Sequence, residues 1–135
     1  MEKREFQILN PDARAALEKG KEYFAGNEFR VILFKESGEE YFVAHCLEMD
    51  VVSHGETANE ALENLIEAMA FHVEYYIDNH MEDQIMTPAP PELWTRFMSR
   101  EAESSETIRF GRRGRRRGQP RLTARRYGEP IYSAY

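Results

Sequence analysis

The stretch Tyr41–Met69, YFVAHCLEMDVVSHGETANEALENLIEAM, decides the fold, because a strand pattern passes directly into a helix pattern within it. Its first side chains alternate between two faces, with the period of 2 that a half-buried strand requires. One face holds Tyr41, Val43 and His45, and the other holds Phe42, Ala44 and Cys46. We therefore predict a short strand here, followed closely by a helix.

The start of this helix is marked by a glycine and a capping pair. Gly55 gives the chain a flexible approach, and Thr57 can act as the N-cap residue. Glu60 follows three residues later, which is the spacing of a capping box, where the carboxylate reaches back to a backbone N–H at the cap. The pattern predicts a helix from Thr57 to about Asn79.

The predicted helix is amphipathic. Its apolar stripe, at helical spacing, holds Ala58, Ala61, Leu62, Leu65, Met69, His72, Val73, Tyr76 and Ile77. The other side holds Glu60, Glu63, Asn64, Glu67, Glu74 and Asp78. We expect the first side to pack on a sheet, with His72 hydrogen-bonded there, and the second side to be an acidic surface. At roughly 35 Å long, the helix should extend past a three-stranded sheet, into a partner chain or a neighbouring segment.

The flanking segments predict the remaining elements. Phe29–Glu36 is rich in β-forming residues and, across a short loop, should form an antiparallel hairpin with the strand that begins at Tyr41. Asp50–His54 predicts a third strand. An Asn-Pro cap predicts an N-terminal helix over residues 11 to 23. After a proline-rich stop, a short helix should begin at residue 91 or 92 and dock through an apolar patch of Leu93, Trp94, Phe97 and Met98.

These elements predict an α+β fold, a three-stranded antiparallel meander packed by one long helix. The predicted segments are an N-terminal helical extension (1–27), the α+β domain (28–91), a short docking helix (92–103) and an Arg-rich C-terminal tail (104–135). The tail contains GRRGRRRG, a low-complexity run that by composition should not bury a core.

Composition fits one compact domain with extensions, since the chain has 135 residues, of which 41% are hydrophobic and 12% aromatic. No run of about 20 apolar residues predicts a membrane span, and the charged opening lacks the apolar stretch of a secretory signal. A single cysteine, Cys46, cannot form an internal disulfide. We therefore expect a cytoplasmic protein.

Charge is divided unevenly along the chain, beneath a formal net charge of −6. Residues 1–106 hold 9 basic and 23 acidic residues, a charge of −14, whereas residues 107–135 hold 9 basic residues and one acidic residue, a charge of +8. An acidic body attracts basic partners, and an Arg-rich tail attracts anionic ones. The two parts need different ligands, or each other.

The order of hairpin, third strand, Gly-x-Thr and acidic amphipathic helix carries a family resemblance. The quoted elements are Tyr41-Phe42-Val43-Ala44, Cys46-Leu47-Glu48-Met49, Gly55-Glu56-Thr57 and Glu60-Ala61-Leu62. Over roughly residues 29–91 they resemble the HicB antitoxins of HicAB type II toxin-antitoxin systems, either as a member with a toxin or as an orphan member.

This resemblance implies a partial ribonuclease-H-like fold without catalysis, which masks a small, basic, mRNA-cleaving toxin of the HicA type. The negative body agrees with that role, because a surface that covers an RNA-binding face should be negative. The toxin-binding residues that we predict are Glu48, Asp50, Glu60, Glu63 and Glu67.

Two other functions remain open. The protein is either an oligomeric nucleic-acid-binding regulator that acts through its tail, or a structural assembly protein whose tail closes an oligomer. Arginines offer planar donor pairs to phosphates, so the predicted nucleic-acid-binding residues are Arg112, Arg113, Arg115, Arg116 and Arg117. We also predict a homo-oligomer, because the long helix and the Leu93–Phe97 patch would leave apolar surface exposed on a monomer.

We expect no metal, cofactor or catalytic residue. His45 and Cys46 are adjacent in a strand and so face opposite sides, and His54 does not complete a usual ligand spacing. The carboxylates are spread along an outward helix face rather than converging on one magnesium ion. Ser53 and His54 are neighbours in a strand and point apart, which disfavours a nucleophile-base pair.

Overall fold

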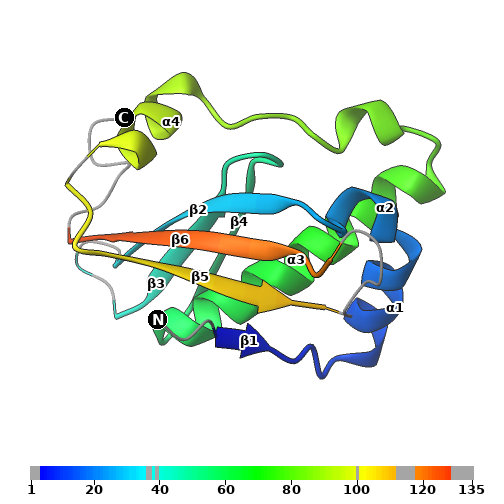
Figure 1. Ribbon diagram of the computed structural model, residues 1–135, viewed down its shortest axis with the longest axis horizontal. Coiled ribbons are helices and arrows are strands. Elements are labelled where there is room, and N and C mark those ends of the chain that lie inside the picture. Colours follow the sequence, from blue (N-terminus) through cyan, green and yellow to red (C-terminus); the bar gives the residue numbers. More distant parts are fainter. Residues whose placement is uncertain (1–3, 36–37, 39, 100, 112–117, 129–135) are drawn as a thin grey trace.

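The computed structural model describes residues 4–35, 38, 40–99, 101–111 and 118–128, which build one six-stranded mixed sheet with helices against both faces (Figure 1). The strands are β1 (Arg4–Phe6), β2 (Glu28–Lys35), β3 (Phe42–Cys46), β4 (Val51–Gly55), β5 (Ser104–Phe110) and β6 (Arg121–Tyr127). The helices are α1 (Pro11–Lys19), α2 (Lys21–Phe24), α3 (Ala58–Asp78), η1 (Glu82–Gln84) and α4 (Pro91–Met98).

The α+β class is confirmed, but the sheet is wider than predicted. Its order is β1-β5-β6-β2-β3-β4. β2, β3 and β4 are antiparallel neighbours, with Val31 opposite Cys46 and Ala44 opposite Ser53. β6 pairs in parallel with β2, and β1 pairs in parallel with β5. The three predicted strands are therefore half of a mixed sheet.

Residues 104–110 and 121–127, which we predicted as parts of an Arg-rich tail, are the strands β5 and β6, whereas residues 112–117 of the Arg/Gly-rich run lie outside the described residues. These strands form an antiparallel pair inserted between β1 and β2. Ile108, Phe110 and Leu122 are fully buried. Their spacing of two residues within each strand, also seen at Leu122 and Ala124, puts apolar side chains on one face. Arginines at the alternate positions hid this pattern in the composition.

The N-terminal segment is also part of the sheet. The predicted helix is present as α1 and the single-turn α2, and Asn10 Oδ1 accepts hydrogen bonds from the backbone N–H of Asp12 at 2.9 Å and of Ala13 at 3.4 Å. β1, which we did not predict, precedes them. Strands from segments 1–27, 28–91 and 104–135 therefore share one sheet.

α3 begins as predicted. Thr57 Oγ1 accepts a hydrogen bond from the Glu60 N–H at 3.0 Å, and the Glu60 carboxylate accepts one from Glu56 N–H at 3.3 Å, one residue before the cap. Gly55 is needed here for space, because a Cβ atom at this position would lie 2.5 Å from the backbone nitrogen of Ala61. The close approach lets the helix fold back along β4.

The main core lies between one face of the sheet and α1 and α3. It contains, among others, Phe24, Phe29, Val31, Ala44, Cys46, Leu62, Leu65, Ile66, Met69, Val73, Ile108 and Phe110. The C-terminal half of α3 is covered by α1, so the predicted overhang is filled by a neighbouring segment of the same chain. His72 Nε2 lies 3.0 Å from the carbonyl oxygen of Ile85, as expected for a hydrogen-bonded histidine.

A second core lies on the other face, under α4. Leu93 and Phe97 are buried there against Ile32, Phe34, Val43, Leu47 and Tyr127. Met98 is 70% exposed, so its predicted place in the docking patch is wrong. The patch is covered within the chain, which removes one of the two reasons for expecting a homo-oligomer. α1 covers only one side of the α3 end, so the other reason remains a prediction.

The α4 helix is held by polar contacts with β6 as well as by apolar packing. Arg125 Nη1 donates to the Phe97 carbonyl at 2.7 Å, and its guanidinium lies 4.9 Å from the Phe97 ring centre. The Tyr127 hydroxyl donates to the Arg96 carbonyl at 2.8 Å. None of the helices described is both long and apolar enough to span a bilayer.

Candidate functional site

The first turns of α3 lie between the two edge strands of the sheet. On one side, Arg4 of β1 donates from Nη1 to Asn59 Oδ1 at 2.7 Å. On the other side, Asn64 Nδ2 donates to the carbonyl oxygen of His54, in β4, at 2.9 Å. The sheet therefore curls around this helix, and Figure 1 shows the start of α3 close to β1.

An acidic row follows the outer side of α3 in this opening. At about 100° per residue, Glu60, Glu63 and Glu67 lie within roughly 60° of one another, between the directions of Asn59 and Asn64. Glu60 and Glu63 are exposed, and Glu67 is half-buried. The buried stripe of the helix points the opposite way. The acidic row is therefore presented to solvent between β1 and β4.

Exposed aromatic side chains continue the same helix surface. Phe71 is 38% exposed and Tyr75 is 58% exposed, and both follow Asn64 at helical spacing, on the side of β4. Large apolar side chains next to charged ones are typical of protein-binding surfaces. We call Glu60, Glu63, Glu67, Phe71 and Tyr75 the α3 outer face.

Among the residues that the structure describes, the ion pairs of α3 carboxylates lie at the far end of the helix and not at its beginning. Lys19 of α1 lies 3.1 Å from Asp78 and 3.2 Å from Glu74, and the hydrogen bonds that it donates to Asp78 and Glu74 raise the Lys19 pKa. Glu67 accepts a long hydrogen bond, 3.3 Å, from Asn10. Within the described residues, the α3 carboxylates without an ion pair are therefore those of its first half, where Arg4 bonds to Asn59 and Glu106.

The other two predicted toxin-binding residues lie in the turn between β3 and β4, where they have local partners. Glu48 accepts hydrogen bonds from the Arg30 backbone and guanidinium, both at 2.8 Å, and its side chain is only 17% exposed. Asp50 adopts a left-handed conformation, with φ of 54°, and lies 2.6 Å from His45 Nε2. Both carboxylates therefore stabilise the turn.

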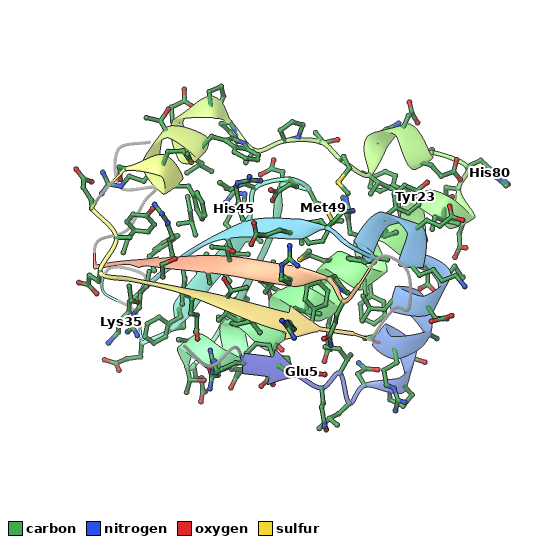
Figure 2. The ribbon with its side chains drawn as sticks, viewed as in Figure 1. Glu5, Tyr23, Lys35, His45, Met49 and His80 are labelled. Carbon is green, nitrogen blue, oxygen red and sulfur yellow. The ribbon has the colours of Figure 1, made fainter. Side chains whose placement is uncertain are left out.

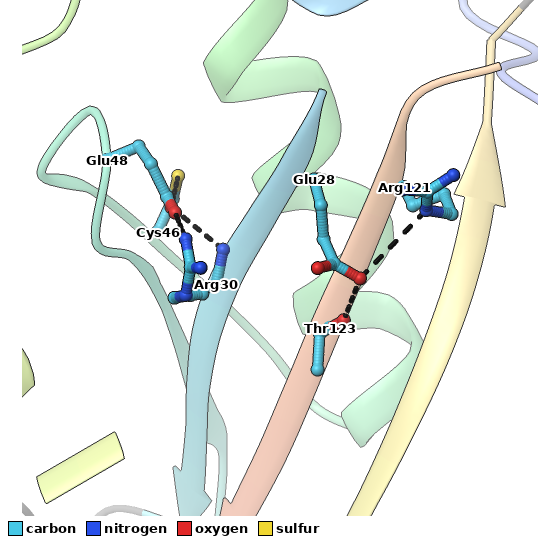
Figure 3. A network of polar contacts seen from close by, with 6 residues as sticks. All are labelled: Glu28, Arg30, Cys46, Glu48, Arg121 and Thr123. Atoms are coloured by element: carbon cyan, nitrogen blue, oxygen red, sulfur yellow. Dashed lines mark hydrogen bonds and ion pairs between the residues drawn. The ribbon is translucent and has the colours of Figure 1, made fainter. Parts of the chain in front are cut away.

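Figure 3 shows that Glu48 belongs to a set of polar contacts on β2 and its neighbours. Cys46 Sγ lies 3.9 Å from Glu48 Oε1, and Glu28 accepts from the Thr123 hydroxyl at 2.8 Å. Arg121 is 3.9 Å from the same Glu28 oxygen. These contacts join β2 to β3 on one side and to β6 on the other, a structural role.

His45 and Cys46 point to opposite faces of the sheet, as predicted. Burial lowers the pKa of His45 against the opposing effect of the Asp50 carboxylate. Burial also raises the pKa of the Cys46 thiol to about 12, so the thiolate is not formed at neutral pH. Within the described residues, no group of three His, Cys, Asp or Glu side chains is placed to hold a metal ion.

A half-open groove of about 720 Å³ lies at the other end of the molecule, between β1, α1, α2 and the end of the β5–β6 hairpin. Its floor includes Phe6, Leu17 and Phe24, and its rim carries Arg14 and Lys21. Glu5 projects from β1 at this groove (Figure 2) and accepts a hydrogen bond from the buried Gln119 at 3.0 Å. The groove meets Gly111, which directly precedes Arg112.

The five predicted nucleic-acid-binding arginines, Arg112, Arg113, Arg115, Arg116 and Arg117, lie outside the described residues. The strands on either side hold four further arginines. Arg125 and Arg126 are engaged with the chain itself, Arg125 at α4 and Arg126 with its guanidinium 4.8 Å from the Phe42 ring centre. Part of the positive charge of the C-terminal segment thus serves the fold.

No family model, curated protein or solved structure matches this chain. The α3 outer face must therefore be interpreted from its own geometry. Sequence periodicity found the acidic residues of α3 but missed Phe71 and Tyr75, whose spacing from Asn64 was the available signal. It could not find the opening between β1 and β4, because β1 is only three residues long.

Proposed function

We propose that the α3 outer face binds a basic protein and that the chain is a non-catalytic, antitoxin-like module. Its partner would be a small, basic, mRNA-cleaving toxin, inactivated by occlusion of its RNA-binding surface. The observation that carries this proposal is the row of Glu60, Glu63 and Glu67, which has no ion pair among the described residues, beside exposed Phe71 and Tyr75. The resemblance of residues 29–91 to HicB, with its partial ribonuclease-H-like fold, supports the same function.

The two kinds of side chain on this face have different physical roles. Carboxylates attract a basic partner over a distance of about 10 Å and mainly raise the association rate. Aromatic side chains, once desolvated, contribute most of the affinity, since binding energy is concentrated in a few large residues. A toxin surface rich in lysine and arginine, with one apolar pocket, would complement both.

The proposal is tested by capturing partners from native cytosol with the full-length chain, after nuclease treatment. We expect a small basic protein to bind wild type and to be lost from Glu60→Lys/Glu63→Lys. The matched control is Glu82→Lys/Asp83→Lys, which makes the same charge change on exposed residues of η1. Equal capture by both double variants, or capture of nucleic acid alone, would contradict the proposal.

A second function is supported by the groove. Arg14 and Lys21 line the same groove as Gly111, the residue that precedes the Arg-rich run in the sequence. The alternative is therefore a nucleic-acid-binding regulator, held by phosphate contacts and sensitive to salt. Replacing the five arginines of this run by serine should then abolish binding of single-stranded RNA in a gel-shift titration, and Arg14→Ser should weaken it. Unchanged RNA binding would exclude this function.

A further inference from the structure

We propose that β4 is the edge to which the basic partner adds an extended segment, so that alternate lysine or arginine side chains of that segment lie over the acidic row of α3. This inference rests on the proposed function, because it specifies how the partner binds the same face. It concerns a strand that the antitoxin-like proposal does not use. In the part of the chain that the structure describes, β4 pairs with β3 alone.

Along an antiparallel strand, the backbone N–H and C=O groups of successive residues point alternately to one neighbouring strand and to the other. This alternation determines which groups of β4 are free for pairing. Leu47 N–H donates to the Arg30 carbonyl at 2.9 Å, so Leu47 and, two and four residues earlier, His45 and Val43 direct their backbone groups toward β2. The intervening residues of β3 therefore direct theirs toward β4, and Ala44 exchanges hydrogen bonds with Ser53.

It follows that the backbone N–H and C=O groups of Val52 and His54 point to the side of β4 opposite β3. The His54 carbonyl accepts a hydrogen bond from the Asn64 side chain, which agrees with this direction of the backbone groups. Among the described residues, nothing bonds to the two N–H groups or to the Val52 carbonyl, which are available for a further strand. The side chain of Val52 is 50% exposed.

β4 lacks the residues that usually prevent strand addition, and α3 covers its edge only at the His54 carbonyl, through Asn64. Such edges are protected by lysine, by proline, by a bulge or by an inward-pointing charge. The sequence of β4, VVSHG, contains none of these residues, and its register with β3 is continuous. Addition of a strand is a common mode of peptide recognition, with main-chain bonds for affinity and alternate side chains for specificity.

Charge identifies the occupant. Side chains of an added strand alternate between the face of Ser53, where α3 lies, and the face of Val52. Three alternate residues span about 13 Å, close to the roughly 10 Å from Glu60 to Glu67 along the helix. Basic residues on the first side would therefore meet the acidic row. A second copy of this chain would bring a second acidic α3 there, which like-charge repulsion disfavours.

The same alternation determines which backbone amides of the added segment donate hydrogen bonds to β4. We propose antiparallel addition, in which a residue opposite Val52 or His54 exchanges hydrogen bonds with β4 and has its side chain on the face of Val52. The basic residues, one position away, direct their amides to the other side. The pairing amides therefore belong to the residues between the basic ones.

The test uses the full-length protein and three synthetic peptides, an acetylated Lys-Val-Lys-Val-Lys-Val-Lys peptide and two N-methylated versions of it. One version is methylated on the valine amides and the other on three lysine amides. We expect the lysine-methylated peptide to bind like the parent by calorimetry. The valine-methylated peptide should bind at least tenfold more weakly, about 1.4 kcal/mol. Val52→Pro, which removes one outward N–H, should weaken the parent peptide similarly.

Two results would overturn the inference, and they separate it from the proposed function. In the first result, the two methylated peptides bind wild type equally and neither binds Glu60→Gln/Glu63→Gln. This result would reject strand addition while leaving the acidic face as a binding surface. No binding of any peptide, together with self-association that Val52→Pro abolishes, would assign the edge to a second copy. Circular dichroism of each variant confirms that loss of binding is not loss of folding.

Discussion

Cys46 is the one thiol of the chain, and its environment predicts that it is chemically inert. Its side chain is fully buried, and its pKa is raised to about 12 by burial and by the charges of Glu48 and Asp50. A thiol reagent such as 5,5′-dithiobis(2-nitrobenzoate) should therefore react with native protein only as fast as the chain opens. Reaction in denaturant should be immediate. Rapid reaction of the native protein would contradict this burial.

His45 should make folding stability depend on pH in the weakly acidic range. Burial lowers its pKa in the folded state below the ordinary value of 6.5, so the unfolded chain binds a proton more readily. Stability is then complete above about pH 6.5 and falls as the pH drops toward the folded-state pKa, by about 1.4 kcal/mol per unit of separation.

The measurement for this histidine is urea unfolding at pH 7.5 and pH 5.5. Wild type should lose more stability between the two than His45→Gln, which cannot take up the proton. His80→Gln is the control, because His80 is exposed on the loop after α3. Equal losses for wild type and His45→Gln would show that another group causes the pH dependence.

For single residues, the sequence predicted the features that depend on near neighbours in the chain and not those that depend on distant ones. The alternation of His45 and Cys46 and the Thr57 cap depend on residues within a few positions, so sequence alone revealed them. The pairing of Glu48 with Arg30 depends on the β2–β3 register, across 18 residues. For that reason the sequence alone could not reveal the contact of Glu48 with Arg30.

Among the helices and strands, α4 gives the clearest test of the packing that the structure describes. Phe97 is 5% exposed and packs in the second core, under the Arg125 guanidinium. Phe97→Ala should therefore destabilise the protein by roughly 3–5 kcal/mol. Met98→Ala, one residue away, should change the stability by less than about 0.5 kcal/mol, because Met98 is 70% exposed. Chemical denaturation of both variants checks the difference, and equal effects would place α4 elsewhere.

Elements with strong periodicity were predictable, and elements disguised by composition were not. α3 and α4 each show an apolar stripe over several turns. β5 and β6 lie on either side of an arginine-glycine run, which dominated the interpretation of the whole segment. β1 has three residues, too few for a period of 2 to be recognised.

The whole molecule depends on its C-terminal hairpin. Ile108, Phe110 and Leu122 belong to the main core, and β6 pairs with seven residues of β2. A chain ending at residue 103 should therefore fail to fold, as judged by loss of the cooperative thermal transition. Replacing residues 112–117 with a Gly-Ser sequence of equal length should keep that transition. A folded truncated chain would restore the view of this segment as a dispensable tail.

The position of β6 has a consequence for the living cell. This strand lies near the middle of the sheet, yet the ribosome makes it after every other strand that the structure describes. Until then, one edge of β2 has no partner, and fast local folding cannot complete the nascent molecule, since β6 pairs with residues of β2 that lie 93 positions earlier. A messenger RNA cut upstream of the β6 codons would thus yield chains without β6, which cannot complete the sheet and are removed by proteases. Accumulation of the folded protein would therefore depend on intact messenger RNA.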